Sequence, residues 1–329
     1  MAKVSLDDLV AESHIRSLDM RRDLEIVADL IESSFALQHD VDGQAFLREM
    51  RQAAKDARFL GWVGGWAQTQ GEAIPGFVWE QDGKVVGNVS MIPFIRGDKK
   101  TYVIANVAVQ EAYRRRGIAR ALTDHAIRFL HRRAITDIWL QVKSSNDGAI
   151  KLYENLGFTY FCCRNTWRAH PPFIANDKTN PEKSFILRHR KRSQWQAQKD
   201  WLERLYPPEI QWHFQVNFAD FNPAVSWQPS HWAEALNYRH WCLYGGKDIP
   251  LSFITRQATQ TYADSLWLAV DPSLDEEDAV LKLLQLFLRK PRGRRPLQVD
   301  YPCEQAEAAF QEAGFSLHRT LIWMKHQPG

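Results

Sequence analysis

An internal repeat constrains the fold of this chain more than any other feature. Residues 141–158 align without a gap onto residues 298–315, at a constant offset of 157. A second match lies upstream, where residues 108–109 correspond to residues 269–270 at an offset of 161. The identical pairs of the longer match are Gln141/Gln298, Val142/Val299, Ala149/Ala306, Gly157/Gly314 and Phe158/Phe315. Such self-similarity is typical of a duplicated unit, and 329 residues are enough for two domains of ordinary size.

Hydrophobic patterning predicts a mixed α/β domain in the first half. Asp82-Gly83 joins two apolar stretches, which is a strong hairpin signal. The predicted strands are residues 14–18, 77–80, 84–92, 102–109, 137–142 and 158–168, and the predicted helices are residues 23–35, 44–59, 118–133 and 149–156. The order strand, helix, strand, helix, strand recurs in the second half. We therefore expect an α/β fold (an α+β mixed sheet) that is repeated in tandem.

Composition narrows the functional classes. The 42 basic and 39 acidic residues leave a net charge of only +3, so the charge does not indicate a nucleic-acid partner. No apolar run approaches the ~18 residues of a membrane span, and the charged N-terminal segment does not resemble a signal peptide. The histidines form no ligand pair, so we expect no metal. We interpret Cys162, Cys163, Cys242 and Cys303 as reduced thiols of a cytoplasmic protein, because they lack metal-ligand spacing.

A basic loop leads into a helix after the apolar strand at residues 102–109. The run reads Arg114, Arg115, Arg116, Gly117, Ile118 and Ala119. The first turn of a helix exposes unpaired N–H groups and the positive end of the helix dipole, which suit an anion. Gly117 would let the backbone approach a phosphate closely. This context favours an anion site over a solvated helix start, but it does not identify the anion.

Two blocks of the sequence resemble the GNAT superfamily of N-acyltransferases. The family signature of Gln or Arg, two residues, Gly, one residue, then Gly or Ala falls on Arg114, Gly117 and Ala119. The second block reads Asn146, Ala149, Leu152-Tyr153-Glu154 and Leu156-Gly157-Phe158. The resemblance is specific over residues 102–160. It implies an acetyl-CoA-dependent N-acetyltransferase with a catalytic domain at residues 1–170 and a second GNAT-like domain at 184–329. The prolines and small or polar residues of the segment between them predict a linker at 171–183.

The resemblance also implies a role for each matched position. The backbone of residues 114–119 would hold the coenzyme A pyrophosphate. Amides near Val107 and Val109, where a bulge splays the strand from its neighbour, would pair with the pantetheine arm, and Asn146 would bond to the same arm. The N–H of Val107 could stabilise negative charge on the thioester oxygen. Tyr153 would protonate the departing thiolate, because a hydroxyl with a pKa near ~10 can share a proton with a thiol near ~8.5.

Alternatives remain for several of these residues. Tyr153 has apolar neighbours at helical spacing, so core packing is its other reading. Asn146 is also a candidate helix cap, and the cap and ligand roles do not exclude each other. The strand at 102–110 has no carboxylate where many relatives place a general base. Glu80 and a water relayed to backbone carbonyls are both candidates for that base.

The second copy lacks this chemistry. Its loop reads Ser273-Leu-Asp-Glu-Glu-Asp278, with no glycine and four acidic residues that would repel a pyrophosphate. Phe310 replaces Tyr153, and Cys303 replaces Asn146. We expect an active first copy, a degenerate second copy and an amine-bearing acceptor of unknown identity; the oligomeric state is open. The alternative is a regulatory or nucleic-acid-associated protein that binds acyl-CoA without turnover.

Overall fold

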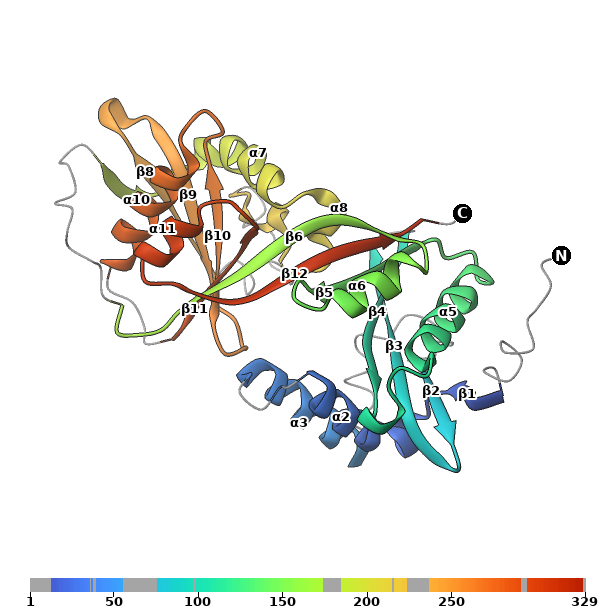
Figure 1. Ribbon diagram of the computed structural model, residues 1–329. Helices are drawn as coiled ribbons and strands as arrows, with labels where there is room; N and C mark the ends of the chain where they lie inside the picture. The colour runs from blue at the N-terminus through green and yellow to red at the C-terminus, as the bar shows by residue number, and fades with distance from the viewer. Residues whose placement is uncertain are drawn as a thin grey trace. The chain divides into compact units, whose positions relative to one another are not determined.

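The computed structural model of the protein describes residues 13–35, 37, 40–55, 76–96, 99–173, 185–214, 216–223, 237–290 and 295–327. The chain divides into two compact units, which are Met1–Phe161 with Ile322–Gly329 (unit 1) and Cys162–Leu321 (unit 2). It passes between the units twice, within β6 (Phe158–Ala169) and within β12 (Ser316–His326). These two strands are neighbours (Figure 1), so each unit holds part of both.

The sheet of unit 1 has the strand order β1-β2-β3-β4-β5-β12-β6. Its first five strands are β1 (Ile15–Ser17), β2 (Gly76–Gln81), β3 (Lys84–Arg96), β4 (Lys99–Val109) and β5 (Asp137–Lys143). β2 and β3 form the hairpin predicted at Asp82-Gly83, where both turn residues have positive φ, 52° and 73°. β3 and β4 are antiparallel, whereas β4 and β5 are parallel. The mixed sheet predicted from the sequence is confirmed.

Helices cover both faces of this sheet because successive strand residues point to opposite sides. The helices are α2 (Met20–Phe35), α3 (Val41–Lys55), α5 (Ile118–His131) and α6 (Asp147–Glu154), with a short 3-10 turn η3 (Glu111–Tyr113). On β2, Val78 packs in the apolar cluster of α2 and α3, whereas Phe77 and Trp79 pack in that of α5 and α6. Residues 56–59 of one predicted helix lie outside the described residues. Within the described ranges, no helix has the length and apolar character that crossing a membrane requires.

Part of β12 completes the sheet of unit 1. The Gln327 N–H donates to the Gly157 carbonyl at 3.0 Å. Trp323 and Met324 are only 2% and 1% exposed, and Met324 belongs to the apolar cluster of α5 and α6. The predicted end of the first domain is residue 170. The structure instead groups Ile322–Gly329 with Met1–Phe161, because the last strand of the second repeat pairs within the first sheet.

Unit 2 repeats the element order of unit 1. Its strands follow the order β12-β6-β11-β10-β9-β8-β7. The remaining elements are β7 (Ile186–His189), η4 (Arg192–Gln194), α7 (Trp195–Leu205), α8 (Pro208–Gln211), η5 (Phe218–Phe221), β8 (Tyr238–Tyr244), η8 (Gly246–Asp248), β9 (Pro250–Gln257), β10 (Asp264–Val270), α10 (Glu276–Leu288), β11 (Leu297–Pro302) and α11 (Glu307–Glu312). The series β10-α10-β11-α11-β12 corresponds to β4-α5-β5-α6-β6, as the sequence repeat predicts. Of the predicted linker, residues 174–183 lie outside the described residues.

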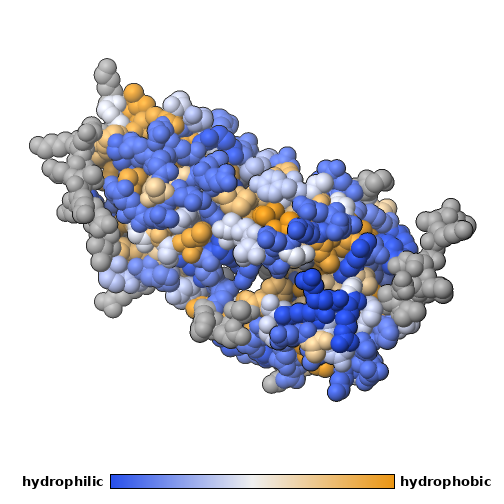
Figure 2. Space-filling model, in the orientation of Figure 1, coloured by the Kyte–Doolittle hydropathy of each residue, from blue (hydrophilic) through white to orange (hydrophobic). Residues whose placement is uncertain are grey.

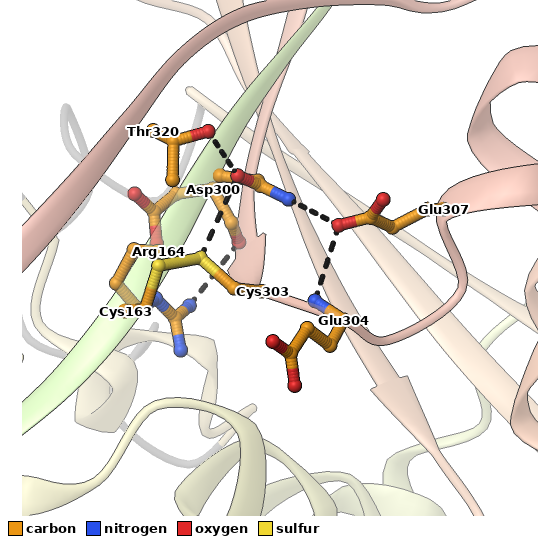
Figure 3. The surroundings of a disulfide bond; sticks show 8 residues. Cys163, Arg164, Asp300, Cys303, Glu304, Glu307 and Thr320 are labelled. Atoms are coloured by element: carbon orange, nitrogen blue, oxygen red, sulfur yellow. Dashed lines mark hydrogen bonds and ion pairs between the residues drawn. A yellow bond between two sulfur atoms is a disulfide. The ribbon is translucent and has the colours of Figure 1, made fainter. Parts of the chain in front are cut away.

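One prediction from the cysteines is wrong. Cys163 on β6 and Cys303 just after β11 form a disulfide bond, with their Cα atoms 5.4 Å apart (Figure 3). Both positions were expected to carry reduced thiols. β6 and β11 are antiparallel neighbours, and the Cys303 N–H donates to the Cys163 carbonyl at 3.1 Å. The ladder therefore brings together two residues 140 positions apart, while Cys162 and Cys242 keep free thiols.

Candidate active site

The sheet of unit 1 opens between β4 and β5. Their parallel ladder joins Thr101–Ile104 of β4 to Asp137–Leu140 of β5, and the described pairing ends there. Both strands continue past the last pair, β4 to Val109 and β5 to Lys143. Each strand edge in a sheet carries N–H and C=O groups that need partners. Beyond Ile104, the edge of β4 that faced β5 can therefore bond to a ligand.

A bulge in β4 sets the direction of the backbone at this edge. The register between β3 and β4 shifts between Asn88 and Ser90, and opposite it Asn106 has a left-handed φ of 51°. Further along, the Gln110 N–H donates to a β3 carbonyl at 2.8 Å. Because N–H groups alternate in direction along a strand, those of Val107 and Val109 point away from β3. This is the edge where β5 has separated, which supports the ligand roles predicted for these two amides.

The N-terminus of α5 is not capped by a side chain. Gly117 is the N-cap with φ 79°, and the first helical hydrogen bond runs from the Ala121 N–H to the Gly117 carbonyl at 2.9 Å. The N–H groups of Ile118, Ala119 and Arg120 therefore have no partner within the helix. A Cβ built on Gly117 would meet no atom within 4 Å, so the space beside this residue is open. The arrangement suits a bound phosphate.

Basic side chains surround this N-terminus. Arg114, Arg115, Arg116 and Arg120 are all exposed. The space-filling view shows strongly hydrophilic surface in the region of unit 1 that carries α5 (Figure 2). Arg114 is fixed by its Nε, which donates to the Val109 carbonyl at 3.0 Å. The positive charge of these side chains adds to that of the helix dipole in attracting an anion.

Helix α6 carries the other two predicted ligands. Asn146 is its exposed N-cap, and the Asn146 Oδ1 accepts from the Ala149 N–H at 3.2 Å. The cap role is therefore confirmed, and it uses only the oxygen of the amide. Tyr153 is 8% exposed and its ring centroid lies 6.0 Å from that of Phe158. Burial raises the pKa of Tyr153 to about 12, so this hydroxyl keeps its proton at neutral pH and can act as a donor.

One apolar cluster gathers most of these residues. Val109, Ile118 and Tyr153 are buried members of it, and Val107 and Ala119 pack against it. The cluster therefore joins the edge of β4, the start of α5 and the predicted acid of α6 in one region of unit 1. The core packing of Tyr153 is confirmed, and its chemical role stays a prediction.

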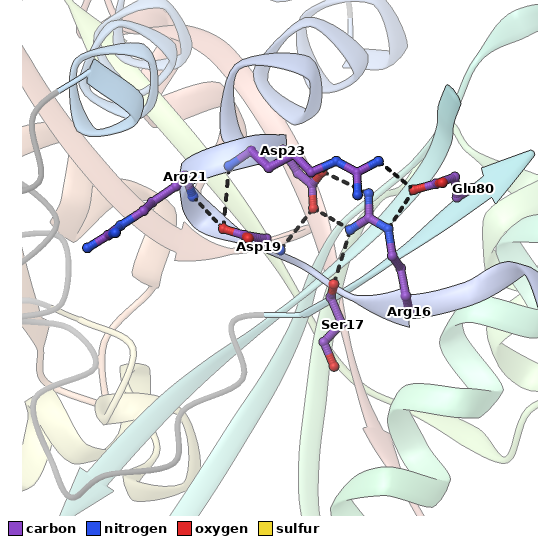
Figure 4. A network of polar contacts seen from close by, with 7 residues as sticks. Arg16, Ser17, Asp19, Arg21, Asp23 and Glu80 are labelled. Atoms are coloured by element: carbon purple, nitrogen blue, oxygen red, sulfur yellow. Dashed lines mark hydrogen bonds and ion pairs between the residues drawn. The ribbon is translucent and has the colours of Figure 1, made fainter. Parts of the chain in front are cut away.

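The candidate base Glu80 is held in ion pairs. Arg16 donates to Glu80 and to Asp23, each at 2.6 Å, and Arg22 donates to Glu80 at 3.0 Å (Figure 4). The hydrogen bond from Arg16 lowers the pKa of Glu80, and the charges of both arginines lower it further. A carboxylate held in this way is a weak proton acceptor. In the described part of the chain, no three His, Cys, Asp or Glu side chains gather as possible metal ligands.

A polar cluster beside the bulge has no counterpart in the sequence analysis. The Asn88 Nδ2 donates to the Asn106 carbonyl at 2.9 Å, and the Ser90 Oγ lies 3.3 Å from the side-chain nitrogens of both asparagines. The one available signal was the presence of Asn88 and Ser90 in an otherwise apolar strand. Periodicity alone does not distinguish such residues from the solvent-facing positions of a strand.

The corresponding region of unit 2 is occupied by its own carboxylates. The parallel ladder of β10 and β11 also ends early, at the pair Leu266 and Val299. There, however, Asp275 caps α10 by accepting from the Asp278 N–H at 2.8 Å. Glu277 accepts from the Ala309 N–H, at the start of α11. A side chain of unit 2 thus bonds to an amide in the first turn of α10, whereas the first turn of α5 has no side-chain cap.

The sequence of the first half matches a known family. Residues 39–158 match the model of the acetyltransferase (GNAT) family. The [ribosomal protein bS18]-alanine N-acetyltransferase of Escherichia coli (strain K12) is 38% identical over 101 residues, which cover 31% of this chain and 66% of that protein. The chain thus spans slightly less than two thirds of the length of this curated relative.

Solved structures share the fold over nearly the whole chain. A GCN5-related N-acetyltransferase from Sphaerobacter thermophilus has a TM-score of 0.59 at 15% identity, covering 96% of each chain. A tandem GNAT protein from the clavulanic acid biosynthesis pathway has a TM-score of 0.50 at 15% identity, covering 96% of this chain and 99% of that one. Residues 39–158 thus match the GNAT family model, and the chain as a whole has the tandem GNAT fold.

Proposed function

We propose that this chain transfers an acetyl group from acetyl-CoA to an amine by direct attack, and that the reaction takes place in unit 1. The observation that carries the proposal is the opening between β4 and β5 beside the uncapped N-terminus of α5. The opening exposes backbone donors along the edge of β4, and the N-terminus of α5 provides amides and positive charge for a phosphate. Together they match a ligand with an extended amide-bearing arm and a pyrophosphate.

The residues present fit coenzyme A. The amides that begin α5, with Arg114, Arg115 and Arg116, would hold the pyrophosphate. The edge of β4 at Val107 and Val109 would pair with the amide groups of the arm. Asn146 Nδ2 would donate to the same arm, since only its Oδ1 is used by the cap.

Three groups would then act on the reacting atoms. The Val107 N–H would stabilise the negative charge that builds on the thioester oxygen as the amine attacks. Tyr153 would donate a hydrogen bond to the leaving sulfur. With a pKa raised to about 12 it holds its proton more tightly than a free tyrosine, so it would keep that proton and stabilise the sulfur as a hydrogen-bonded thiolate, while the C–S bond breaks and the amine proton passes to the base. The ion pairs of Glu80 favour a relayed water as the base that removes the amine proton.

We assign one site to each chain. In unit 2, Asp275, Glu276 and Glu277 place carboxylates at the helix start where unit 1 has Arg114–116 and Gly117. Phe310 replaces Tyr153 and is fully buried against Trp167, with ring centroids 5.2 Å apart. Cys303 replaces Asn146 and is bound in the disulfide. Titration calorimetry with acetyl-CoA should give one site per chain, and two equivalent sites would refute this assignment.

The acceptor is an amine. The E. coli relative is named for the alanine of ribosomal protein bS18, so the α-amine of a protein is the first acceptor class to test. The decisive experiment measures free-thiol release from acetyl-CoA with peptides that begin with alanine, with a polyamine and with an aminoglycoside. Thiol release that depends on one of these acceptors supports the transferase. Tight acetyl-CoA binding without release for any acceptor would favour the alternative, a regulatory protein that binds acyl-CoA without turnover.

A further inference from the structure

Asn88 is a polar residue whose neighbours in the sheet are apolar. In the register of the sheet it lies between Val78 of β2 and Ala108 of β4, both of which pack in the apolar cluster of α2 and α3. Its side chain is 0% exposed. A buried amide among apolar neighbours costs free energy unless it makes hydrogen bonds. Its partners should therefore account for its presence.

The shorter of the two hydrogen bonds of the Asn88 side chain leads to a peptide group. Its Nδ2 donates to the main-chain carbonyl of Asn106 at 2.9 Å. Its Oδ1 accepts no hydrogen bond from the described residues. The carbonyl can only accept, so this contact also fixes which end of the Asn88 amide is the nitrogen. The Asn88 amide thus leaves its oxygen without a hydrogen bond from the described residues while its nitrogen holds the Asn106 carbonyl.

The residue that carries this carbonyl departs from the extended conformation of its strand. Asn106 has a φ of 51° in the middle of β4, in the left-handed region that asparagine adopts more readily than most other residues with a side chain. Its side-chain nitrogen lies 3.3 Å from the Ser90 Oγ, which is also 3.3 Å from the Asn88 Nδ2. Asn88 and Ser90 thus hold Asn106 from its main chain and from its side chain. Such a conformation persists only when its surroundings fix it.

The orientation of that carbonyl determines the direction of the next N–H. A peptide group is planar and trans, so the C=O of Asn106 and the N–H of Val107 point in opposite directions. A carbonyl held toward Asn88 on β3 turns the Val107 N–H away from β3. We infer that Asn88 is a positioning residue, which aims the Val107 N–H at the edge of β4 where the thioester oxygen would lie. The inference rests on the function proposed for that N–H.

The first test needs no ligand. Asn88→Leu keeps the size of the side chain and removes the donor, and it is made in the full chain. The residual dipolar coupling of the Val107 N–H reports the direction of that bond, with Val103, in the paired part of β4, as an internal reference. We expect a changed coupling at Val107, a shifted carbonyl carbon resonance at Asn106 and an unchanged coupling at Val103. Unchanged values at both Val107 and Asn106 would overturn the inference.

A matched variant separates positioning from general destabilisation. Asn165 of unit 2 is also buried, 2% exposed, and its Nδ2 donates to Glu307 at 2.8 Å. Asn165→Leu should lower stability and leave the Val107 coupling unchanged. In the acetyl transfer assay we expect Asn88→Leu to lower kcat by about tenfold to hundredfold with little change in acetyl-CoA affinity, because one preorganised donor is misaimed. Equal kcat losses for the two variants would overturn the positioning role.

A third variant gives a pH signature. The carboxyl of Asn88→Asp can donate to the Asn106 carbonyl only while it is protonated. The ratio of variant to wild-type kcat should therefore rise as the pH falls, and a ratio independent of pH would count against the inference. If the wild-type chain binds no acetyl-CoA, the proposed function fails, while the dipolar couplings of the free protein still decide whether Asn88 orients Val107.

Discussion

Gly157 and Gly314 have the same left-handed backbone conformation, with φ of 85° and 86°, at equivalent places in the two units. Gly157 donates its N–H to the Glu154 carbonyl at 3.0 Å, and Gly314 donates to the Gln311 carbonyl at 3.0 Å. Each glycine ends the short helix that carries Tyr153 or Phe310. The repeat has therefore kept the backbone that presents this aromatic ring, while only unit 1 keeps the oxygen on it.

The hydroxyl group of Tyr153 is expected to contribute more to turnover than to stability. Tyr153→Phe keeps the ring and its packing against Phe158, and it removes the donor to the leaving sulfur. We expect kcat to fall by about 10² or more, with acetyl-CoA affinity nearly unchanged. An acyl donor with a more acidic thiol should reduce the defect, because that sulfur leaves without help. Steady-state kinetics and calorimetry measure both quantities.

A buried tyrosine of unit 2 is the control for this variant. Tyr206 is fully buried, and its hydroxyl accepts from the Leu268 N–H at 3.5 Å. Tyr206→Phe should leave kcat unchanged.

The pH dependence of kcat gives a further test. Since burial raises the pKa of Tyr153 to about 12, its hydroxyl stays protonated as the pH rises, and kcat should show no fall from this group below about pH 11. A Tyr153→Phe enzyme with wild-type kcat would refute the assignment.

Gly117 and Gly83 form a natural pair for testing the phosphate site. Both have a positive φ, 79° and 73°, and a Cβ built on either meets no atom within 4 Å. Either Gly→Ala substitution should therefore cost a similar backbone strain of about 1 kcal/mol. Only Gly117→Ala places a methyl group where a pyrophosphate would approach α5. We expect weaker acetyl-CoA binding for Gly117→Ala alone, measured by calorimetry; equal affinities for the two variants would argue against the site.

Glu80→Gln tests the choice of base. A general base contributes about 10²- to 10⁴-fold to the rate, so its loss is easily seen. Because the hydrogen bond from Arg16 lowers the pKa of Glu80, we expect this variant to keep kcat within about threefold at neutral pH. A hundredfold loss in a variant that remains folded by circular dichroism would restore Glu80 as the base.

The disulfide predicts a definite thiol count. Alkylation of the denatured, unreduced chain should label two thiols, those of Cys162 and Cys242, and reduction should expose all four. Replacing both Cys163 and Cys303 by serine opens a loop of 140 residues. Loop-closure entropy then predicts a loss of about 4–5 kcal/mol in the free energy of unfolding. Cys162→Ser, at the adjacent free thiol, is the control. Four labelled thiols without reduction would contradict the disulfide.

A buried and an exposed residue of β12 test whether unit 1 depends on this strand. Met324 is 1% exposed in the apolar cluster that contains Tyr153, whereas Leu317 on the same strand is 48% exposed. Met324→Asp should destabilise unit 1 by about 3 kcal/mol or more and abolish acetyl-CoA binding, because a carboxylate is buried among apolar groups. Leu317→Asp should leave both unchanged. Binding that survives Met324→Asp in a folded chain would mean that unit 1 does not depend on β12.

The sequence predicted those parts of the fold that depend on interactions between neighbouring residues. The hairpin at Asp82-Gly83 and the glycine that opens α5 follow from conformational preferences of single residues, so they could be read from the sequence. The pairing of Cys163 with Cys303 and the contact of Arg16 with Glu80 join residues 140 and 64 positions apart. No spacing rule reports such contacts. The repeat likewise predicted the elements of both halves, but it could not say which sheet the strand at residues 322–326 would join.

That strand affects the order in which the molecule can be made. During synthesis, residues 39–158 emerge from the ribosome with every predicted ligand of acetyl-CoA present. The sheet that supports them still lacks residues 322–326, which follow the whole of unit 2. Until those residues emerge, the buried face around Tyr153 remains open to solvent. Folding of unit 1 can therefore be completed only late in translation. A chain that stops early contains every predicted site residue but not the strand that completes their sheet.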